Sequence, residues 1–419
     1  MAKDENYTFR IADILLKEIL EAMGAVLIVG PKACGKTTTA EQQAKSILYV
    51  DEPGKRESYK QMAQTNIRFL LEGATPRLID EWQEIPQFWD AIRWEVDHRD
   101  GEGQFMLTGS AVPVHSEEIH HTGTGRYGWL TMRPMSLYES GESNGAVSLG
   151  ALFEGKTDFA ANAPNHTLKD IAFMICRGGW PKAMRKTEKA ALSQVSEYYK
   201  AITNSDISRA DNTKRDAERA KRIMRSYARH QGSQVSLATI LADISASETE
   251  EVSDETVASY LNALRKIFVI EDMPAWNPNL RSKTAIRTSE TRYYVDPSIG
   301  VAALGLGPND LMNDLNTFGL FFETLCIRDL RVYADALDGS VYHYRDKNGL
   351  ECDAVMHLRG GRYGLIEIKL GGVTGIEEGA ETLKKLANKI DTTKMKAPAF
   401  LMVLTAIGQF AYTRTDGVK

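Results

Sequence analysis

Short apolar runs alternate with amphipathic segments over the first 140 residues of the chain. The apolar runs predict strands at 25–29, 47–50, 77–80 and 104–108. Between them, residues 36–46, 59–71 and 88–98 carry apolar side chains at helical spacing. Strands that alternate with helices are typical of a parallel sheet covered by helices, so residues 1–147 predict an α/β domain.

The rest of the chain changes pattern three times. Residues 148–212 are mostly helical in pattern and predict a helical lid. Residues 213–304 hold three helical windows and then two extended stretches, which is the order of a winged helix-turn-helix. Residues 305–419 alternate helix and strand again and predict a second α/β domain.

Composition narrows the class of protein. Of 419 residues, 43% are hydrophobic and 26% are charged, the balance of a folded globular protein. The 51 Lys and Arg residues against 56 Asp and Glu residues give a net charge of −5, so any surface that binds nucleic acid must be local. No apolar run approaches the roughly 18 residues of a membrane span, and no signal peptide is recognised. The four cysteines are far apart and form no C-x-x-C pair, which indicates a reducing compartment. Together with the lack of a long apolar run, this leads us to expect a cytoplasmic protein without a membrane partner.

A glycine-rich segment predicts a nucleotide site. Residues 30–37, GPKACGKT, fit G-x-x-x-x-G-K-[ST], follow the run 25–29 and open a helix. The glycines let backbone N–H groups turn toward phosphates, and the helix N-terminus adds positive potential. We expect Lys36 to reach the β- and γ-phosphates of ATP and Thr37 to bind Mg²⁺. The predicted nucleotide-binding residues are Gly30, Pro31, Lys32, Ala33, Cys34, Gly35, Lys36, Thr37, Thr38, Asp80 and Ser110.

Two acids at the end of a neighbouring strand indicate hydrolysis. The run 77–80 ends in Asp80, which fits a Mg²⁺ ligand, and Glu81 fits the residue that polarises the attacking water. Ser110, just after the run 104–108, is a candidate γ-phosphate sensor, although a turn-forming role is as consistent with the pattern. Arg126 is a candidate to neutralise transition-state charge, in its own chain or in a neighbouring subunit.

A second group of charged residues lies near the C-terminus. Residues 350–358 and 363–370 alternate in polarity and predict a hairpin joined by residues 359–361. If the apolar faces coincide, Asp353 lies opposite or near Glu367, and Lys369 converges with them. Such a group can hold Mg²⁺ or Mn²⁺ and orient water for attack on a phosphodiester, with Glu323 as a further carboxylate. On pattern alone, an ordinary polar face explains the same residues.

One helical window is strongly cationic. Between residues 214 and 229 there are seven basic residues and two acids, a local patch that suits a phosphate backbone. The third window instead begins with Asp254 and Glu255, which favour helix stability over base reading. We therefore expect DNA to be held mainly through its backbone.

These motifs together resemble prokaryotic AAA-type ATPases that pair a P-loop core with a C-terminal domain of unknown function. The resemblance covers nearly the whole chain and rests on GPKACGKTT, LIDEWQEIP, LTGS, GR followed by RPMSLYE, GGWP, YRDKNGLECD and IEIK. It implies that residues 305–419 are similar to the PD-(D/E)XK (restriction-endonuclease-like) nuclease fold and that the protein forms a homo-oligomer.

The sequence thus predicts an ATP-hydrolysing AAA-type protein that binds DNA, branched or forked forms included, and remodels or cleaves it with Mg²⁺. The alternative is an ATP-gated regulatory or interaction protein whose nuclease-like domain is an inactive scaffold. The predicted catalytic residues are Lys36, Glu81, Arg126, Asp353, Glu367 and Lys369. The predicted metal ligands are Thr37, Asp80, Glu323, Asp353 and Glu367.

Overall fold

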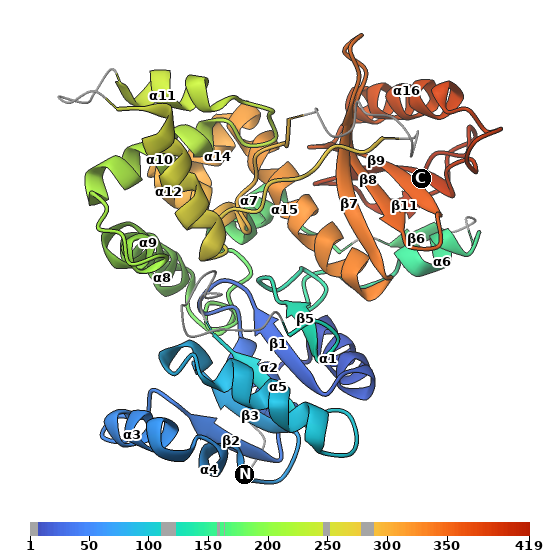
Figure 1. Ribbon diagram of the computed structural model, residues 1–419. Coiled ribbons are helices and arrows are strands. Elements are labelled where there is room, and N and C mark those ends of the chain that lie inside the picture. The colour runs from blue at the N-terminus through green and yellow to red at the C-terminus, as the bar shows by residue number, and fades with distance from the viewer. Residues whose placement is uncertain (1–6, 110–122, 157–159, 163, 246–251, 278–288) are drawn as a thin grey trace. The chain divides into compact units, whose positions relative to one another are not determined.

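The computed structural model describes residues 7–109, 123–156, 160–162, 164–245, 252–277 and 289–419 (Figure 1). The predicted site residue Ser110 lies outside these ranges. The chain divides into two compact units. The first is Met1–Pro134 with Lys266–Phe268, and the second is Met135–Arg265 with Val269–Lys419. The finer division into a lid, a winged helix and a nuclease-like domain stays a prediction.

The first unit contains a five-stranded parallel sheet, which confirms the predicted α/β class. The strand order is β2-β3-β4-β1-β5. The strands are β1 (Ala25–Val29), β2 (Ser46–Tyr49), β3 (Arg77–Asp80), β4 (Phe105–Thr108) and β5 (Tyr127–Thr131). Every residue of β1 is buried between its two neighbours, so the segment that follows it starts from a fixed point in the sheet. The edge strand β5 was not predicted. Its residues Gly128, Trp129 and Thr131 are at least partly exposed, so the strand lacks the continuous apolar run of a buried strand.

Helices join these strands. They are α1 (Ile11–Ala22), α2 (Lys36–Gln43), α3 (Arg56–Asn66), α4 (Arg68–Leu71) and α5 (Phe88–His98), with a 3₁₀ turn at Trp82–Glu84. The predicted helix 59–71 is two helices instead of one, because the Asn66 side chain accepts a hydrogen bond from the Arg68 N–H and competes with the helical ladder. The predicted helix 36–46 ends early, since Ala44 is extended.

The first half of the second unit is mainly helical. Its elements are α6 (Leu149–Phe153), β6 (Ala160–Asn162), α7 (Leu168–Arg177), α8 (Glu188–Ala201), a π-helical turn (Ile202–Asp206), α9 (Ile207–Arg209), α10 (Ala217–Arg229), α11 (Leu237–Ser245), α12 (Asp254–Lys266), α13 (Pro297–Leu304) and α14 (Pro308–Asn313). The strand β6 was not predicted, because it forms only by pairing with the distant β11 (Phe410–Tyr412). After α12, antiparallel bridges join Ile270 to Tyr294 and Met273 to Thr291.

The second half contains a four-stranded sheet in the order β10-β9-β8-β7. Its elements are α15 (Leu315–Ala336), β7 (Gly339–Arg345), β8 (Glu351–Leu358), β9 (Tyr363–Lys369), α16 (Val373–Lys389) and β10 (Phe400–Thr405). Helix α15 packs on β7 and β8, and α16 packs on β9 and β10. The predicted hairpin is confirmed: Ala354 pairs with Ile366 in antiparallel register, and Gly361 in the connection has a φ of 79°.

A buried ion-pair cluster holds the second unit together. The Arg328 guanidinium on α15 donates to Asp296 at 3.0 Å and to Asp329 at 2.9 Å. Asp296 in turn accepts from the Gly179 N–H, and Asp329 accepts from the Leu137 N–H, both at 2.9 Å. The sequence motifs RPMSLYE and GGWP therefore supply backbone donors to a structural cluster.

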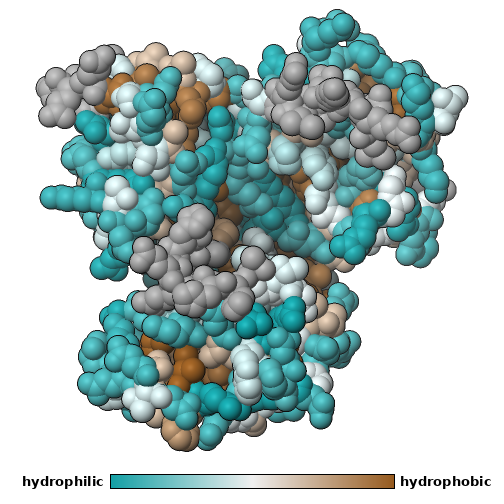
Figure 2. All heavy atoms as spheres, viewed as in Figure 1, coloured by the Kyte–Doolittle hydropathy of each residue, from teal (hydrophilic) through white to brown (hydrophobic). Residues whose placement is uncertain are grey.

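Hydrophilic residues cover most of the visible face of the molecule (Figure 2). Within the described part of the chain, no helix combines the length and apolarity that a membrane crossing requires.

Candidate functional site

The segment between β1 and α2 has the backbone of a phosphate-binding loop. Gly30 and Gly35 have φ values of 147° and 106°, and Ala33 has a φ of 62°. Such left-handed residues turn successive N–H groups toward one side of a loop. Lys36, which is 8% exposed, folds back over this loop and donates to the carbonyls of Gly30 at 2.9 Å and Pro31 at 2.8 Å. The loop thus presents its amides and one ammonium group together.

Asp80 contacts this loop from the end of β3, which β4 separates from β1 in the sheet. The Thr37 hydroxyl donates to Asp80 Oδ1 at 2.8 Å, and the Thr108 hydroxyl donates to the same oxygen. The register of β3 and β4 explains the second contact, because Asp80 and Thr108 are direct partners in the sheet. A hydroxyl and a carboxylate oxygen are the hard donors that Mg²⁺ prefers, so Thr37 and Asp80 fit a Mg²⁺ site.

Glu81 lies beside this pair in a strained conformation. Its φ of 54° is unusual for a residue other than glycine. The Gln83 amide donates to Glu81 Oε2. Burial raises the pKa of the Glu81 carboxyl, and the hydrogen bond from Gln83 opposes that rise. A half-buried carboxylate with a raised pKa suits a group that accepts a proton from water.

Contacts from the N-terminal segment support the loop. The buried Arg10 guanidinium donates at 2.8 Å to the carbonyl of Cys34 and at 2.8 Å to that of Arg133. The Tyr7 hydroxyl lies 2.8 Å from that of Thr39 on α2. Sequence reasoning missed these residues because no local motif marks them.

The other predicted loop residues have varied surroundings. Cys34 is buried, with its Sγ 3.8 Å from the Met132 carbonyl. Lys32 and Thr38 are half-buried, and Ala33 is exposed. These residues shape the loop through their backbone.

The structure does not bring Arg126 to this loop. Arg126 precedes β5, whose first residue pairs with Ala25 at the amino end of β1, whereas the phosphate-binding loop follows the carboxyl end of β1. Its guanidinium donates to Asp97 at 2.9 Å. A role in the loop of its own chain therefore has no geometric support.

The second predicted group comes together in the four-stranded sheet. Lys369 Nζ lies 2.7 Å from Glu367 Oε2 and 3.5 Å from Asp353 Oδ2. Asp353 also accepts from the Ile368 N–H at 2.7 Å. Glu367 is 4% exposed, and its Oε1 accepts no hydrogen bond within the described residues.

Glu323 on α15 completes this acidic group. Burial and then the charge of Asp353 raise the pKa of Glu323 to about 8, while the same two causes raise that of Glu367 to about 7. Burial lowers the pKa of the Lys369 ammonium, but the negative charges of Asp353 and Glu367 outweigh burial and raise that pKa overall. The Tyr293 hydroxyl donates to Glu323, a contact that sequence reasoning missed. Among the residues that the structure describes, no three His, Cys, Asp or Glu side chains form a ready-made metal centre.

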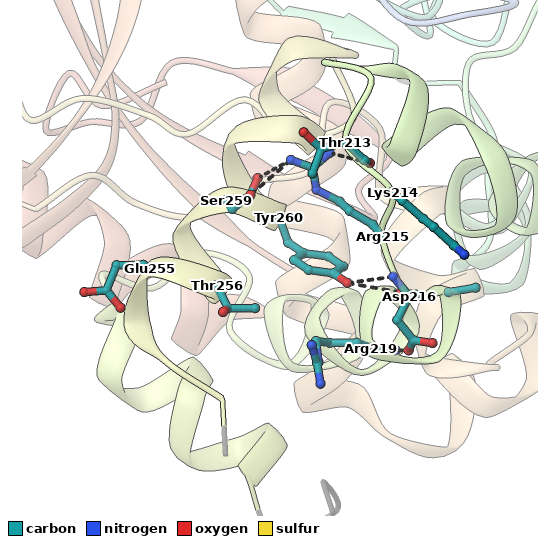
Figure 3. A pocket seen from close by; sticks show the side chains of 10 residues that line it. Thr213, Lys214, Arg215, Asp216, Arg219, Glu255, Thr256, Ser259 and Tyr260 are labelled. Atoms are coloured by element: carbon teal, nitrogen blue, oxygen red, sulfur yellow. Dashed lines mark hydrogen bonds between the residues drawn. The ribbon is translucent and has the colours of Figure 1, made fainter. Parts of the chain in front are cut away.

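A cavity of about 660 Å³ lies in the helical half of the second unit (Figure 3). It lies at the start of α10 and against α12. Its lining is Thr213, Lys214, Arg215, Asp216, Ala217, Arg219, Glu255, Thr256, Ser259 and Tyr260. The Arg215 guanidinium donates to Asp211 at 2.6 Å and to the Ser259 hydroxyl at 3.1 Å, so its charge is paired within the fold.

Comparisons with known proteins separate three parts of the chain. Residues 23–141 match the family model of an AAA domain. Residues 168–310 and 318–417 match two models described as domains of unknown function, DUF8612 and DUF4143. The AAA match coincides with the strands that carry the loop, Asp80 and Glu81, and it supports an AAA-type ATPase core.

Two curated relatives are the uncharacterized proteins Mb2031c of Mycobacterium bovis and Rv2008c of Mycobacterium tuberculosis. Each is 23% identical over 368 residues, which is 86% of this chain and 73% of the relative. Among solved structures, the Walker-type ATPase PABY2304 of Pyrococcus abyssi is similar at 13% identity with a TM-score of 0.43, over 72% of this chain and 97% of that one.

Proposed function

We propose that the protein binds ATP in the loop at residues 30–37 and hydrolyses it. The observation that carries this proposal is the hydrogen bond from Thr37 to Asp80, with Glu81 directly after it, in the segment that matches an AAA domain. These are the positions that a P-loop hydrolase needs for the metal ion and the attacking water.

Each residue has a distinct task in this proposal. The loop amides and Lys36 hold the β- and γ-phosphates. Thr37 and Asp80 hold Mg²⁺, which neutralises charge on the phosphates when it is bound. Glu81 takes a proton from the attacking water, and its raised pKa brings it closer to working pH.

We also propose that the second unit binds DNA through its winged-helix-like part. Helices α10, α11 and α12 and the bridged ribbon after them have the required order. Lys214, Arg225 and Arg229 are exposed cations before or along α10, and they suit a phosphate backbone. Asp254 and Glu255 at the start of α12 argue against reading bases with that helix terminus.

The C-terminal half is proposed to be a nuclease-like domain that cleaves DNA with Mg²⁺ or Mn²⁺. One observation supports a divalent ion here: the buried Oε1 of Glu367 is a carboxylate oxygen without a partner among the described residues. Asp353, Glu367 and Glu323 would hold such an ion, which supplies charge neutralisation when bound. Lys369 would orient the attacking water through its ammonium group, which the two neighbouring carboxylates keep protonated.

A second candidate function is an ATP-gated regulatory protein whose nuclease-like domain is an inactive scaffold. The ion pairs of Lys369 with both Asp353 and Glu367 favour it, because they already balance these carboxylates. So does the absence of a ready-made metal centre from the described residues.

We propose that the protein forms a homo-oligomer in which Arg126 acts in ATP hydrolysis. Arg126 is 42% exposed and lies away from the loop of its own chain, so it is proposed to reach a neighbouring subunit. Mass measurement with and without a non-hydrolysable ATP analogue tests this, and a protein that stays monomeric in both removes the role.

The DNA proposal is tested by ATP hydrolysis with single-stranded, duplex and branched DNA at low salt. We expect at least one DNA form to bind and to stimulate phosphate release, and a charge-removing triple variant, Lys214→Ala with Arg225→Ala and Arg229→Ala, to lose both effects. Absence of binding and of stimulation by all three forms would remove DNA from the account and leave the ATPase proposal standing.

A further inference from the structure

Gln83 connects Glu81 to the end of the next strand. It lies in the 3₁₀ turn Trp82–Glu84, directly after Glu81. One end of its side chain, Nε2, donates to Glu81 Oε2. The other end, Oε1, lies against Gly109, where an added methyl group would come within 2.1 Å of that oxygen. The carboxamide therefore spans the ends of β3 and β4.

The Oε1 atom of Gln83 is buried and accepts no hydrogen bond from any residue that the structure describes. A buried carbonyl without a donor is unfavourable, and nearly all such groups in proteins have a hydrogen-bond partner. The carboxyl ends of neighbouring parallel strands are also where α/β proteins bind ligands. The unpaired oxygen therefore points to a donor that comes with the substrates.

We propose that Gln83 is a second water-positioning residue of ATP hydrolysis: its Nε2 orients Glu81, and its Oε1 accepts a hydrogen bond from the attacking water. This inference rests on the proposed ATPase function. One O–H of the water points to Glu81 and the other points to Gln83, so the oxygen lone pair faces the γ-phosphorus. Two acceptors fix the orientation of a water molecule, whereas one leaves it free to rotate.

The step balances without a further reactant. The water oxygen forms a bond to the γ-phosphorus, and the bond from that phosphorus to the oxygen bridging it to ADP breaks. Glu81 takes one water proton and passes it on to the released phosphate or to solvent. Gln83 keeps its protons throughout and acts only as donor and acceptor of hydrogen bonds. The products are ADP and inorganic phosphate.

The first test is Gln83→Met, which keeps the approximate volume of the side chain and removes both polar groups. We expect kcat for ATP to fall by about 10- to 100-fold, with KM and ATP binding within about twofold of the wild type, since Gln83 contacts water and not ATP. Gln87→Met is the matched control, because Gln87 is exposed and four residues away on the same segment. It should leave kcat unchanged.

Gly109→Ala tests the same oxygen without altering Gln83. Gly109 does not have a left-handed φ, so alanine suits its backbone, but the new methyl group displaces Oε1. We expect the same fall in kcat at unchanged KM. This variant keeps the inference testable if Gln83→Met fails to fold.

A double-mutant cycle separates positioning from structural support. If Gln83 acts on the same water as Glu81, the variant that carries both Glu81→Gln and Gln83→Met hydrolyses ATP no slower than Glu81→Gln alone. Additive losses, or full kcat in both Gln83→Met and Gly109→Ala while the wild type hydrolyses ATP, overturn this inference and leave the proposed function intact. A wild type that binds ATP without hydrolysing it overturns both.

Discussion

The Thr37 hydroxyl donates a hydrogen bond of 2.8 Å to Asp80 Oδ1 and so ties the first turn of α2 to the end of β3. Thr108 donates to the same oxygen from β4, so two hydroxyls orient one carboxylate. Glu81 is the next residue and has its own partner, Gln83. The acid that suits the metal ion and the acid that suits the water are thus held separately, and variants of each should give different defects.

Glu81→Gln should bind ATP and turn it over slowly. The amide keeps the shape of the side chain but accepts no proton, so we expect turnover to fall by about 10²- to 10⁴-fold while ATP affinity stays within about twofold. Glu84→Gln is the control, since Glu84 pairs with Arg56 at a partly exposed site. Phosphate release and nucleotide titration measure the two quantities, and equal turnover in Glu81→Gln would refute the water-polarising role.

Substitutions in the C-terminal group of Asp353, Glu367 and Lys369 should affect DNA nicking without affecting ATP hydrolysis. We expect Asp353→Ala and Lys369→Ala each to abolish nicking of supercoiled DNA with Mg²⁺ or Mn²⁺, because one removes a carboxylate ligand and the other the adjacent cation. Both should retain the ATPase rate. Gel electrophoresis of the plasmid gives the rate of nicking. Nicking that persists in both variants would place the activity elsewhere, and a wild type that does not nick favours the scaffold function.

Arg328→Met should strongly destabilise the second unit. The Arg328 and Asp296 side chains are 1% and 0% exposed, so removing the cation leaves buried carboxylates without a counter-charge. A broken buried pair of this kind costs about 3–5 kcal/mol of unfolding free energy. Arg359→Met, at an ion pair whose arginine is 84% exposed, should change it by less than about 0.5 kcal/mol. Urea unfolding measures both, and equal losses would contradict the structural role of the cluster.

Glu323 should make the second unit less stable as pH rises. Its pKa is about 8 in the folded protein, against a usual value of about 4.3. Between these values the folded protein binds a proton that the unfolded chain has lost, so the free energy of unfolding falls as pH increases through this window. Glu367, whose pKa is raised to about 7, contributes to the same slope. Glu323→Gln should therefore reduce the slope without abolishing it, whereas Glu381→Gln, at an exposed site on α16, should leave it unchanged. An unchanged slope in Glu323→Gln would show that burial does not keep this carboxyl protonated.

Local patterns predicted much of what positions both sites. The buried run 25–29 and the glycines after it placed the phosphate-binding loop, because these features depend on neighbours in sequence. The period of two in β8 and β9, with glycines between them, placed Asp353 near Glu367. In each case the relevant contacts are set by one element or one turn.

The remaining contacts depend on tertiary structure. Arg10 and Arg133 are 123 residues apart in sequence, and no periodicity relates them. Tyr293 meets Glu323 only because the ribbon after α12 packs on α15. Gln83 is closer to its partner, but its importance depends on the approach of Gly109 from another strand. A polar residue two positions after a strand-ending acid pair was the available signal, and it is too common to assign a role by itself.

Release of inorganic phosphate from ATP with Mg²⁺ tests the central claim most directly. The comparison is between the wild type, Lys36→Ala and the control Lys17→Ala, whose side chain is 70% exposed on α1. We expect the wild type and Lys17→Ala to release phosphate at the same rate and Lys36→Ala to be slower by at least about 100-fold. A wild type that releases no phosphate at saturating ATP, or a Lys36→Ala variant as active as the wild type, would contradict the claim.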